Sequence, residues 1–134
     1  MENNNPKKKI LAIDDEPVIR MVSVKILKAE GFDVDIACNG LVAKEMAGKT
    51  IYDLFLSDIR TPEMNGMQFY DYLSQEQPGQ EDNVIFTTGD VLNVEVKNFL
   101  SNKNNLYLPK PFTPNELRAV IRKAMKTRTT AINV

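Results

Sequence analysis

The sequence predicts a single α/β domain with a parallel sheet covered by helices on both faces. Short apolar runs, typical of buried strands, alternate five times with longer segments whose apolar residues recur at helical spacing. Strands that alternate with helices indicate a doubly wound (βα)5 fold. The length of 134 residues fits one domain. We place it over residues 9–127, with a disordered lead-in over 1–8 and a frayed tail over 128–134.

The predicted strands are short, and one differs from the rest. Asp33–Ala37 alternates polar and apolar residues, which favours an edge position in the sheet. The others are mainly apolar and end at polar or Gly- and Pro-bearing segments. The five predicted strands are Lys9–Ile13, Asp33–Ala37, Leu54–Ser57, Val84–Thr88 and Leu106–Leu108.

Local signals place the predicted helices after Pro17, Asn39, Gly66, Gly89 and Thr113. The last predicted helix has the clearest N-terminal signal, because Thr113 and Glu116 form a capping box with Pro at the first helical position. The expected core face of the first helix is Val18, Met21, Val22, Ile26 and Ala29. The fourth helix is expected over Val91–Leu100, and its core face is Leu92, Val96, Phe99 and Leu100. The core face of the last helix is Leu117, Val120, Ile121, Ala124 and Met125.

Composition excludes several classes of function. The net charge of −1 favours neither nucleic acid nor an anionic membrane, and the short basic run Lys7–Lys9 is expected to be a solvated flank. No apolar stretch approaches the length of a membrane span, so we expect a cytoplasmic protein. The absence of histidine excludes histidine-dependent catalytic triads and a histidine phosphodonor. Cys38 has no internal disulfide partner and is expected to be buried and inert.

Polar residues follow four of the predicted strands where each one ends. They are Asp14 and Asp15, Asp58, Thr88, and Lys110. In open α/β sheets, ligands bind at the carboxyl ends of the strands, so these side chains are expected to meet at one edge. Each residue alone also has an ordinary interpretation, as a helix cap, a turn residue, a strand-end hydroxyl or a surface lysine. Their joint placement favours a site.

The chemistry of this group fits phosphoryl transfer. Asp14, Asp15 and Asp58 would repel one another without a cation, and Mg²⁺ (or Mn²⁺) prefers such oxygen ligands. Lys110 can pair with a phosphoryl oxygen, and Thr88 can donate a hydrogen bond to another. Asp58 is then the expected nucleophile, and its product is an aspartyl phosphate.

These residues resemble the response-regulator receiver domain of two-component signalling, from Lys9 to Thr127. The matching pieces are Asp14-Asp15, the run from Asp58 to Gly66, Thr88-Gly89, and the run from Tyr107 to Phe112. The resemblance implies the strand order 2-1-3-4-5 and a cis Lys110–Pro111 bond. It also implies that Asp58 accepts a phosphoryl group from a histidine kinase or a histidine phosphotransfer protein.

The resemblance assigns further roles. Asp15 would bind Mg²⁺ directly, Asp14 mostly through water, and Arg60 through its backbone carbonyl. Thr88 and Lys110 would bind the phosphoryl oxygens, and Tyr107 would be the aromatic switch that follows Thr88. The expected output surface is the fourth helix, the fifth strand and the fifth helix.

The chain departs from the family pattern at two places. Thr61 stands where the family usually has methionine or a similar apolar residue, and Lys103-Asn104 replaces a small Gly-Ala step. Arg60 and Asp90 occupy positions that tune phosphate lifetime in the family. Their opposite charges suggest a pair across the mouth of the site that restricts the attacking water; the alternative is two solvated charges.

The expected function is therefore a phosphoacceptor switch that catalyses only its own phosphorylation and dephosphorylation. We expect a monomer or a phosphorylation-dependent dimer that does not contact a membrane. No effector domain is expected after Thr127, so we expect no direct contact with nucleic acid. A receiver-like binding module that needs no phosphorylation is the main alternative. A phosphatase with an Asp nucleophile normally has a second Asp at the position of Arg60. A flavodoxin-like cofactor binder would not have acidic residues after its first strand.

Overall fold

The computed structural model describes residues 7–132, with side chains through residue 127. Residues 1–6 of the predicted lead-in and residues 133–134 of the predicted tail lie outside the described residues. Five parallel strands form one sheet in the order β2-β1-β3-β4-β5, as predicted, and β2 is an edge strand. The strands are β1 (Lys9–Ile13), β2 (Asp33–Ala37), β3 (Leu54–Asp58), β4 (Val84–Thr88) and β5 (Tyr107–Pro109).

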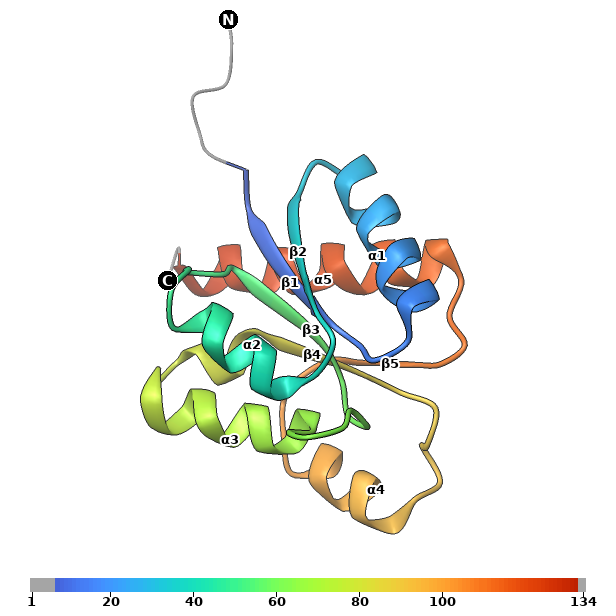
Figure 1. Cartoon of the computed structure of the whole chain (residues 1–134). Coiled ribbons are helices and arrows are strands. Elements are labelled where there is room, and N and C mark those ends of the chain that lie inside the picture. The colour runs from blue at the N-terminus through green and yellow to red at the C-terminus, as the bar shows by residue number, and fades with distance from the viewer. Residues whose placement is uncertain (1–6, 133–134) are drawn as a thin grey trace, which may run out of the picture.

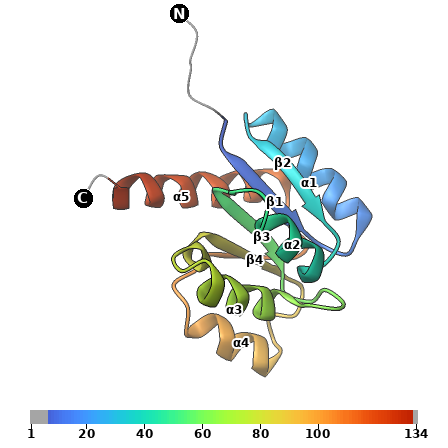
Figure 2. The same ribbon diagram turned by 60° about the vertical axis from the view of Figure 1, so that its left-hand side comes forward.

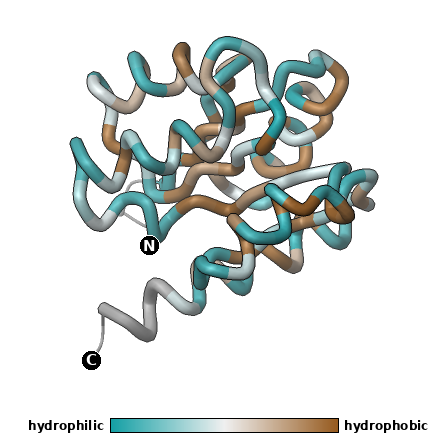
Figure 3. Tube along the Cα trace, turned by 90° about the horizontal axis from the view of Figure 1, so that it is seen from below, coloured by the Kyte–Doolittle hydropathy of each residue, from teal (hydrophilic) through white to brown (hydrophobic). Residues whose placement is uncertain are grey.

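Helices cover both faces of the sheet, α1 and α5 on one and α2, α3 and α4 on the other (Figures 1 and 2). Figure 3 shows hydrophobic stretches concentrated along the strands between these layers. Successive strand residues point to opposite faces, so Leu11 and Phe55 join one core while Ile10 and Leu54 join the other. The helices are α1 (Pro17–Ala29), α2 (Gly40–Ala47), α3 (Gly66–Glu76), α4 (Val94–Ser101) and α5 (Pro114–Ile132), with a 3-10 turn η1 (Gln80–Asn83).

The predicted start and core face of α5 are confirmed. Thr113 Oγ1 accepts from the Glu116 amide at 3.1 Å, and Glu116 Oε1 accepts from the Thr113 amide at 2.8 Å. The predicted face of α5 packs into the core beside α1. The predicted tail is wrong over residues 128–132, because α5 remains helical to Ile132; in Figure 2 this end of α5 extends past the sheet.

The predicted core face of α1 is only partly right, because Ile26 is buried but its other four residues are exposed. Val18 and Met21 are 66% and 67% exposed and Val22 is 40% exposed, whereas the buried residues of the helix are Ser23, Ile26 and Leu27. Apolar residues occur on most sides of α1, so helical spacing matched two different faces. Packing against α5 decides between them, and α1 keeps an exposed apolar stripe.

Three further predictions are corrected. Helix α4 begins at Val94, because the Asn93 side chain accepts from the Val96 amide and caps it; Leu92 lies before the helix and is 86% exposed. Strand β5 begins at Tyr107, one residue later than predicted. Cys38 is exposed, in the turn between β2 and the α2 cap Asn39. Over residues 7–132, none of the helices combines the length and apolar character needed to cross a membrane.

Candidate functional site

The acidic residues meet at the carboxyl edge of the sheet, as predicted. Ile13 of β1 pairs with Ser57 of β3, so the next residues, Asp14 and Asp58, are neighbours. Both are 4% exposed. Asp14, Asp15, Glu16 and Asp58 each offer a carboxylate oxygen, and these oxygens lie within 4.8 Å of one another. The sheet thus places two buried and two exposed carboxylates around one point.

Lys110 reaches into this cluster from the end of β5. Its Nζ lies 2.8 Å from Asp14 Oδ2, 3.0 Å from Asp58 Oδ2 and 3.1 Å from Glu16 Oε1. Its amide donates to the Thr88 carbonyl at 2.8 Å, and the Lys110–Pro111 bond is cis, as expected. Burial alone would lower the pKa of Lys110, but its contacts with the carboxylates of Asp14 and Asp58 raise that pKa above the ordinary value. The ammonium group is therefore a fixed positive charge beside Asp58.

The Asp58 carboxylate is only partly compensated. Its Oδ1 accepts from the Arg60 amide at 3.1 Å, and its Oδ2 accepts from Lys110. Burial nevertheless raises the pKa of Asp58 above the ordinary value; Lys110 opposes this rise, and the negative charge of Asp14 adds to it. The ionised form of Asp58 is thus less favourable here than in water, and a bound cation would favour it.

The donor set fits a hard divalent cation. Asp14 Oδ2 is buried and accepts no well-directed hydrogen bond from any described residue, although Lys110 Nζ is near. The other oxygen of Asp14 accepts from the Glu16 amide at 2.9 Å, so the carboxylate is held with one oxygen toward the cluster. All available ligands are oxygens, which Mg²⁺ prefers. The residues present therefore suit Mg²⁺ or Mn²⁺.

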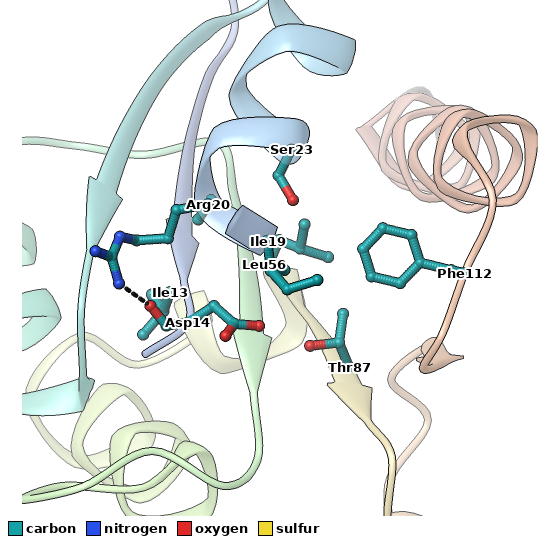
Figure 4. Close-up of a pocket in the computed structure, with 9 residues that line it drawn as sticks. Ile13, Asp14, Ile19, Arg20, Ser23, Leu56, Thr87 and Phe112 are labelled. Carbon is teal, nitrogen blue, oxygen red and sulfur yellow. Dashed lines mark hydrogen bonds between the residues drawn. The ribbon is translucent and has the colours of Figure 1, made fainter. Parts of the chain in front are cut away.

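The turn that carries Asp14 is held from α1. Arg20 Nη1 donates to the Asp14 carbonyl at 2.6 Å, which Figure 4 shows as a dashed line. Beside this turn, a small pocket of about 10 Å³ between the sheet, α1 and the segment before α5 is lined by Ser23, Thr87 and Phe112, among others. This pocket is too small for a ligand larger than a water molecule. The open side of the site lies elsewhere.

The open side is a cleft of about 600 Å³ lined by Asp15, Glu16, Ile19, Asp58, Arg60, Gly89, Asp90, Lys110 and Pro111. Arg60 and Asp90 both line it and form the predicted pair, with Nη2 2.7 Å from Oδ2. Their side chains are 51% and 46% exposed. A salt bridge is therefore part of the lining of the cleft that also contains Asp58.

Thr88 and Tyr107 lie on the same face of the sheet. Phe86 of β4 pairs with Tyr107 of β5, so Tyr107 points to the same side as Phe86 and, two residues on, Thr88. Thr88 is fully buried, and its hydroxyl oxygen accepts from the Asp90 amide at 3.0 Å, which leaves its proton free to be donated. Tyr107 is 49% exposed.

Comparison with known proteins decides the family. The pattern of the response regulator receiver domain matches residues 10–122. The chain belongs to this family. It is 31% identical over 117 residues to the response regulator Rre1 of Synechocystis and 34% identical over 122 residues to the transcriptional regulatory protein SrrA of Staphylococcus aureus. These matches cover 87% and 88% of this chain but 51% and 49% of the relatives, so the chain spans about half their length.

Solved receivers have the same fold. A receiver domain protein from Methanospirillum hungatei is 27% identical with a TM-score of 0.85, and the match covers 94% of this chain and 99% of that one. The receiver domain of a Pseudomonas aeruginosa sensor histidine kinase is also 27% identical, with a TM-score of 0.80 over 90% of this chain and 99% of that one. That structure has a magnesium ion coordinated in its active-site cleft.

One contact in this receiver site was not predicted. Glu16 is exposed, yet its carboxylate lies 3.1 Å from Lys110 Nζ and makes a third acidic partner for that lysine. Its position beside Asp14 and Asp15 was the available signal. All three acids also have an ordinary interpretation as acidic residues at a helix start, so the sequence alone did not single out Glu16 as a partner of Lys110.

Proposed function

We propose that this receiver is a phosphoacceptor switch of a two-component system and that Asp58 takes its phosphoryl group from a phosphohistidine. The supporting observation is the buried Asp58 carboxylate, which faces an open cleft beside the Lys110 ammonium. An Asp58 oxygen attacks phosphorus, the new P–O bond forms and the P–N bond breaks. The electron pair goes to the imidazole nitrogen, which takes up a proton.

Asp14, Asp15, Asp58 and the Arg60 carbonyl are the proposed holders of Mg²⁺ (or Mn²⁺), with Asp14 acting mostly through water. When bound, the cation supplies charge neutralisation for the phosphoryl oxygens. Lys110 pairs with one phosphoryl oxygen once it leaves Asp58, and Thr88 donates its free hydroxyl proton to another. Positioning and charge neutralisation are what phosphoryl transfer chiefly requires.

The proposed output runs from Thr88 through Tyr107 to the surface of α4, β5 and α5. Tyr107 lines a groove of about 250 Å³ on this surface together with Val91, Lys97, Leu100 and Ser101. Leu92 and Val94 are 86% and 71% exposed beside it. A downstream protein that buries these residues would sense a change in the Tyr107 rotamer. The phosphorylated receiver would then bind a target protein or a second copy of the chain.

The phosphohistidine donor is proposed to dock on α1. The exposed residues Val18, Met21 and Val22 lie on this helix, and Ile19 of the same helix lines the phosphoacceptor cleft. A histidine kinase or a histidine phosphotransfer protein seated there would hold its imidazole over Asp58. Because such a donor is phosphorylated from ATP, we also propose a cytoplasmic location.

Intact mass after incubation with acetyl phosphate and Mg²⁺ tests the proposal. We expect one added phosphoryl group that hydroxylamine removes, and none in Asp58→Asn or without metal. The same assay with a phosphorylated histidine phosphotransfer domain would detect a receiver that accepts the phosphoryl group only from a protein donor. No added mass from either donor would overturn the proposal in favour of a binding module that needs no phosphorylation.

A further inference from the structure

The loop that follows Asp58 contains a strained turn. The Met64 amide donates to the Pro62 carbonyl at 2.8 Å, and Glu63 between them has a φ of +67°. A hydrogen bond between residues two apart, around a positive φ, is the pattern of the rarer and more strained kind of γ-turn. Such a conformation persists only where its surroundings hold it. The contacts of this loop therefore identify what holds it.

Two donors converge on the carbonyl oxygen of Met64. Thr61 Oγ1 donates at 2.7 Å, and the amide of Gly40, the first residue of α2, donates at 2.8 Å. Thr61 is only 8% exposed. The approach of α2 is so close that a Cβ at position 40 would overlap the Met64 oxygen and lie 2.8 Å from Met64 Cγ. Position 40 thus requires glycine, and the strained turn is held from two sides.

The same loop is fastened to the phosphoacceptor strand. The Arg60 amide donates to Asp58 Oδ1 at 3.1 Å, and the Gly66 amide donates to the Ile59 carbonyl at 2.9 Å. Thr61 directly follows Arg60, so the hydroxyl that holds Met64 also restrains the peptide group between Arg60 and Thr61. That peptide group contains the Arg60 carbonyl.

We propose that Thr61 is a positioning residue of the phosphoacceptor site. Together with Gly40 it holds the Met64 carbonyl, and it thereby keeps the Arg60 peptide beside Asp58 before any metal binds. Methionine, which the family usually has at this position, has no hydroxyl group and could not donate this hydrogen bond. The expected effect on Mg²⁺ affinity rests on the proposed function, in which the Arg60 carbonyl is a metal ligand. The restraint of the loop by Thr61 does not depend on that function.

Thr61→Val and Thr61→Ser form the matched test, because valine keeps the branched shape and serine keeps the hydroxyl. Gly40→Ala would displace the Met64 carbonyl from the side of α2. Its control is Gly48→Ala at the other end of α2, where a Cβ would find its nearest neighbours at 3.5 Å. Two quantities are measured well below the unfolding temperature: hydrogen exchange of the Gly40 and Arg60 amides without metal, and the Kd for Mg²⁺ by calorimetry.

In Thr61→Val we expect faster exchange at both amides and a Kd for Mg²⁺ raised about tenfold, the lower end of what residues that orient metal ligands contribute. Gly40→Ala should raise the Kd likewise, while Thr61→Ser and Gly48→Ala should match the wild type. Equal exchange and equal Kd in Thr61→Val and Thr61→Ser would overturn the inference, even if Thr61→Val lowered the unfolding temperature. If the wild type bound no Mg²⁺, the metal site in the proposed function would be wrong. The hydrogen-exchange rates of the Gly40 and Arg60 amides would then test the role of Thr61 by themselves.

Discussion

Arg60 Nη2 lies 2.7 Å from Asp90 Oδ2, so a salt bridge joins the loop after β3 to the loop after β4 in the lining of the cleft beside Asp58. Both side chains are about half exposed, and such pairs contribute at most about 1 kcal/mol to stability. The position of the pair matters more than its strength. In the proposed function, water that hydrolyses a phosphoryl group on Asp58 would enter through this cleft.

We therefore expect Arg60→Ala and Asp90→Ala each to raise the rate of autodephosphorylation. The increase should be about fivefold or less, because ~1 kcal/mol corresponds to about that factor in rate. The double variant should add little to either single one, since both remove the same bridge. The rate is read as loss of the phosphoryl mass after acetyl phosphate is removed. Arg122→Ala, which breaks an exposed pair with Glu30 away from the cleft, is the control; unchanged rates in both cleft variants would refute the role.

Asp58→Asn should stabilise the metal-free protein. Burial raises the pKa of Asp58, so its charge opposes folding, and the neutral amide removes that charge while Lys110 keeps Asp14 and Glu16 as partners. We expect the unfolding temperature in EDTA to rise by a few degrees, the shift that about 1 kcal/mol produces in a domain of this size. Excess Mg²⁺ should stabilise the wild type more than the variant, because ligand binding to the folded state adds to stability. The measurement is thermal unfolding with and without metal.

The exposed Asp33→Asn on edge strand β2 is the control and should show neither effect. A metal-free Asp58→Asn protein less stable than the wild type would show that the Lys110 contact outweighs the burial of the charge.

Tyr52 should make stability depend on pH in the alkaline range. The side chain is 2% exposed, and its hydroxyl donates to Asp35 Oδ2 at 2.7 Å. Burial raises the pKa of Tyr52 above its ordinary value of 10.0, and Asp35 adds to the rise. The neutral phenol is thus favoured in the folded state, so its contribution is complete below pH 10.0 and is lost as the pH rises toward the folded-state pKa, because the unfolded chain ionises first.

Tyr52→Phe should therefore cost about 1 kcal/mol at neutral pH, through loss of the hydrogen bond to Asp35. Its stability should then fall less steeply than that of the wild type between about pH 10 and pH 12. Urea unfolding at pH values below and within this window measures both effects. Parallel loss of stability in the two proteins above pH 10 would contradict the assignment.

The sheet and the site were predictable because few physical rules determine them. Parallel strands end at one edge, so polar residues after Ile13, Ser57 and Thr87 had to lie close together whatever the helices did. The capping box at Thr113 was equally local, since its two hydrogen bonds join residues three apart. Predictions of this kind need no knowledge of tertiary packing.

Tertiary packing decided the features that the sequence analysis missed. Helix α1 has apolar residues on most sides, and only its contact with α5 shows that Ile26 is buried while Val22 is not. The Thr61 hydroxyl binds the carbonyl of a strained turn that no local propensity predicts. Asn93 was a recognisable cap, but the apolar Val91 and Leu92 before it suggested an earlier start to α4. Distant contacts thus decided the buried face of α1 and the Thr61 contact, whereas at α4 a local cap prevailed over the apolar residues before it.

The exposed stripe on α1 leads to a prediction about the donor. Val22→Asp should slow phosphotransfer from a histidine kinase or phosphotransfer protein by about tenfold, because a charge in place of a buried apolar contact costs at least ~1.4 kcal/mol. Labelling by acetyl phosphate should be unchanged, because this small donor needs no docking surface. The donor is the purified histidine protein that phosphorylates the wild type fastest. Ile51→Asp is the control: Ile51 is 85% exposed and precedes β3, at the edge of the sheet opposite Asp58. Equal loss with both donors, or equal loss in both variants, would place the docking surface elsewhere.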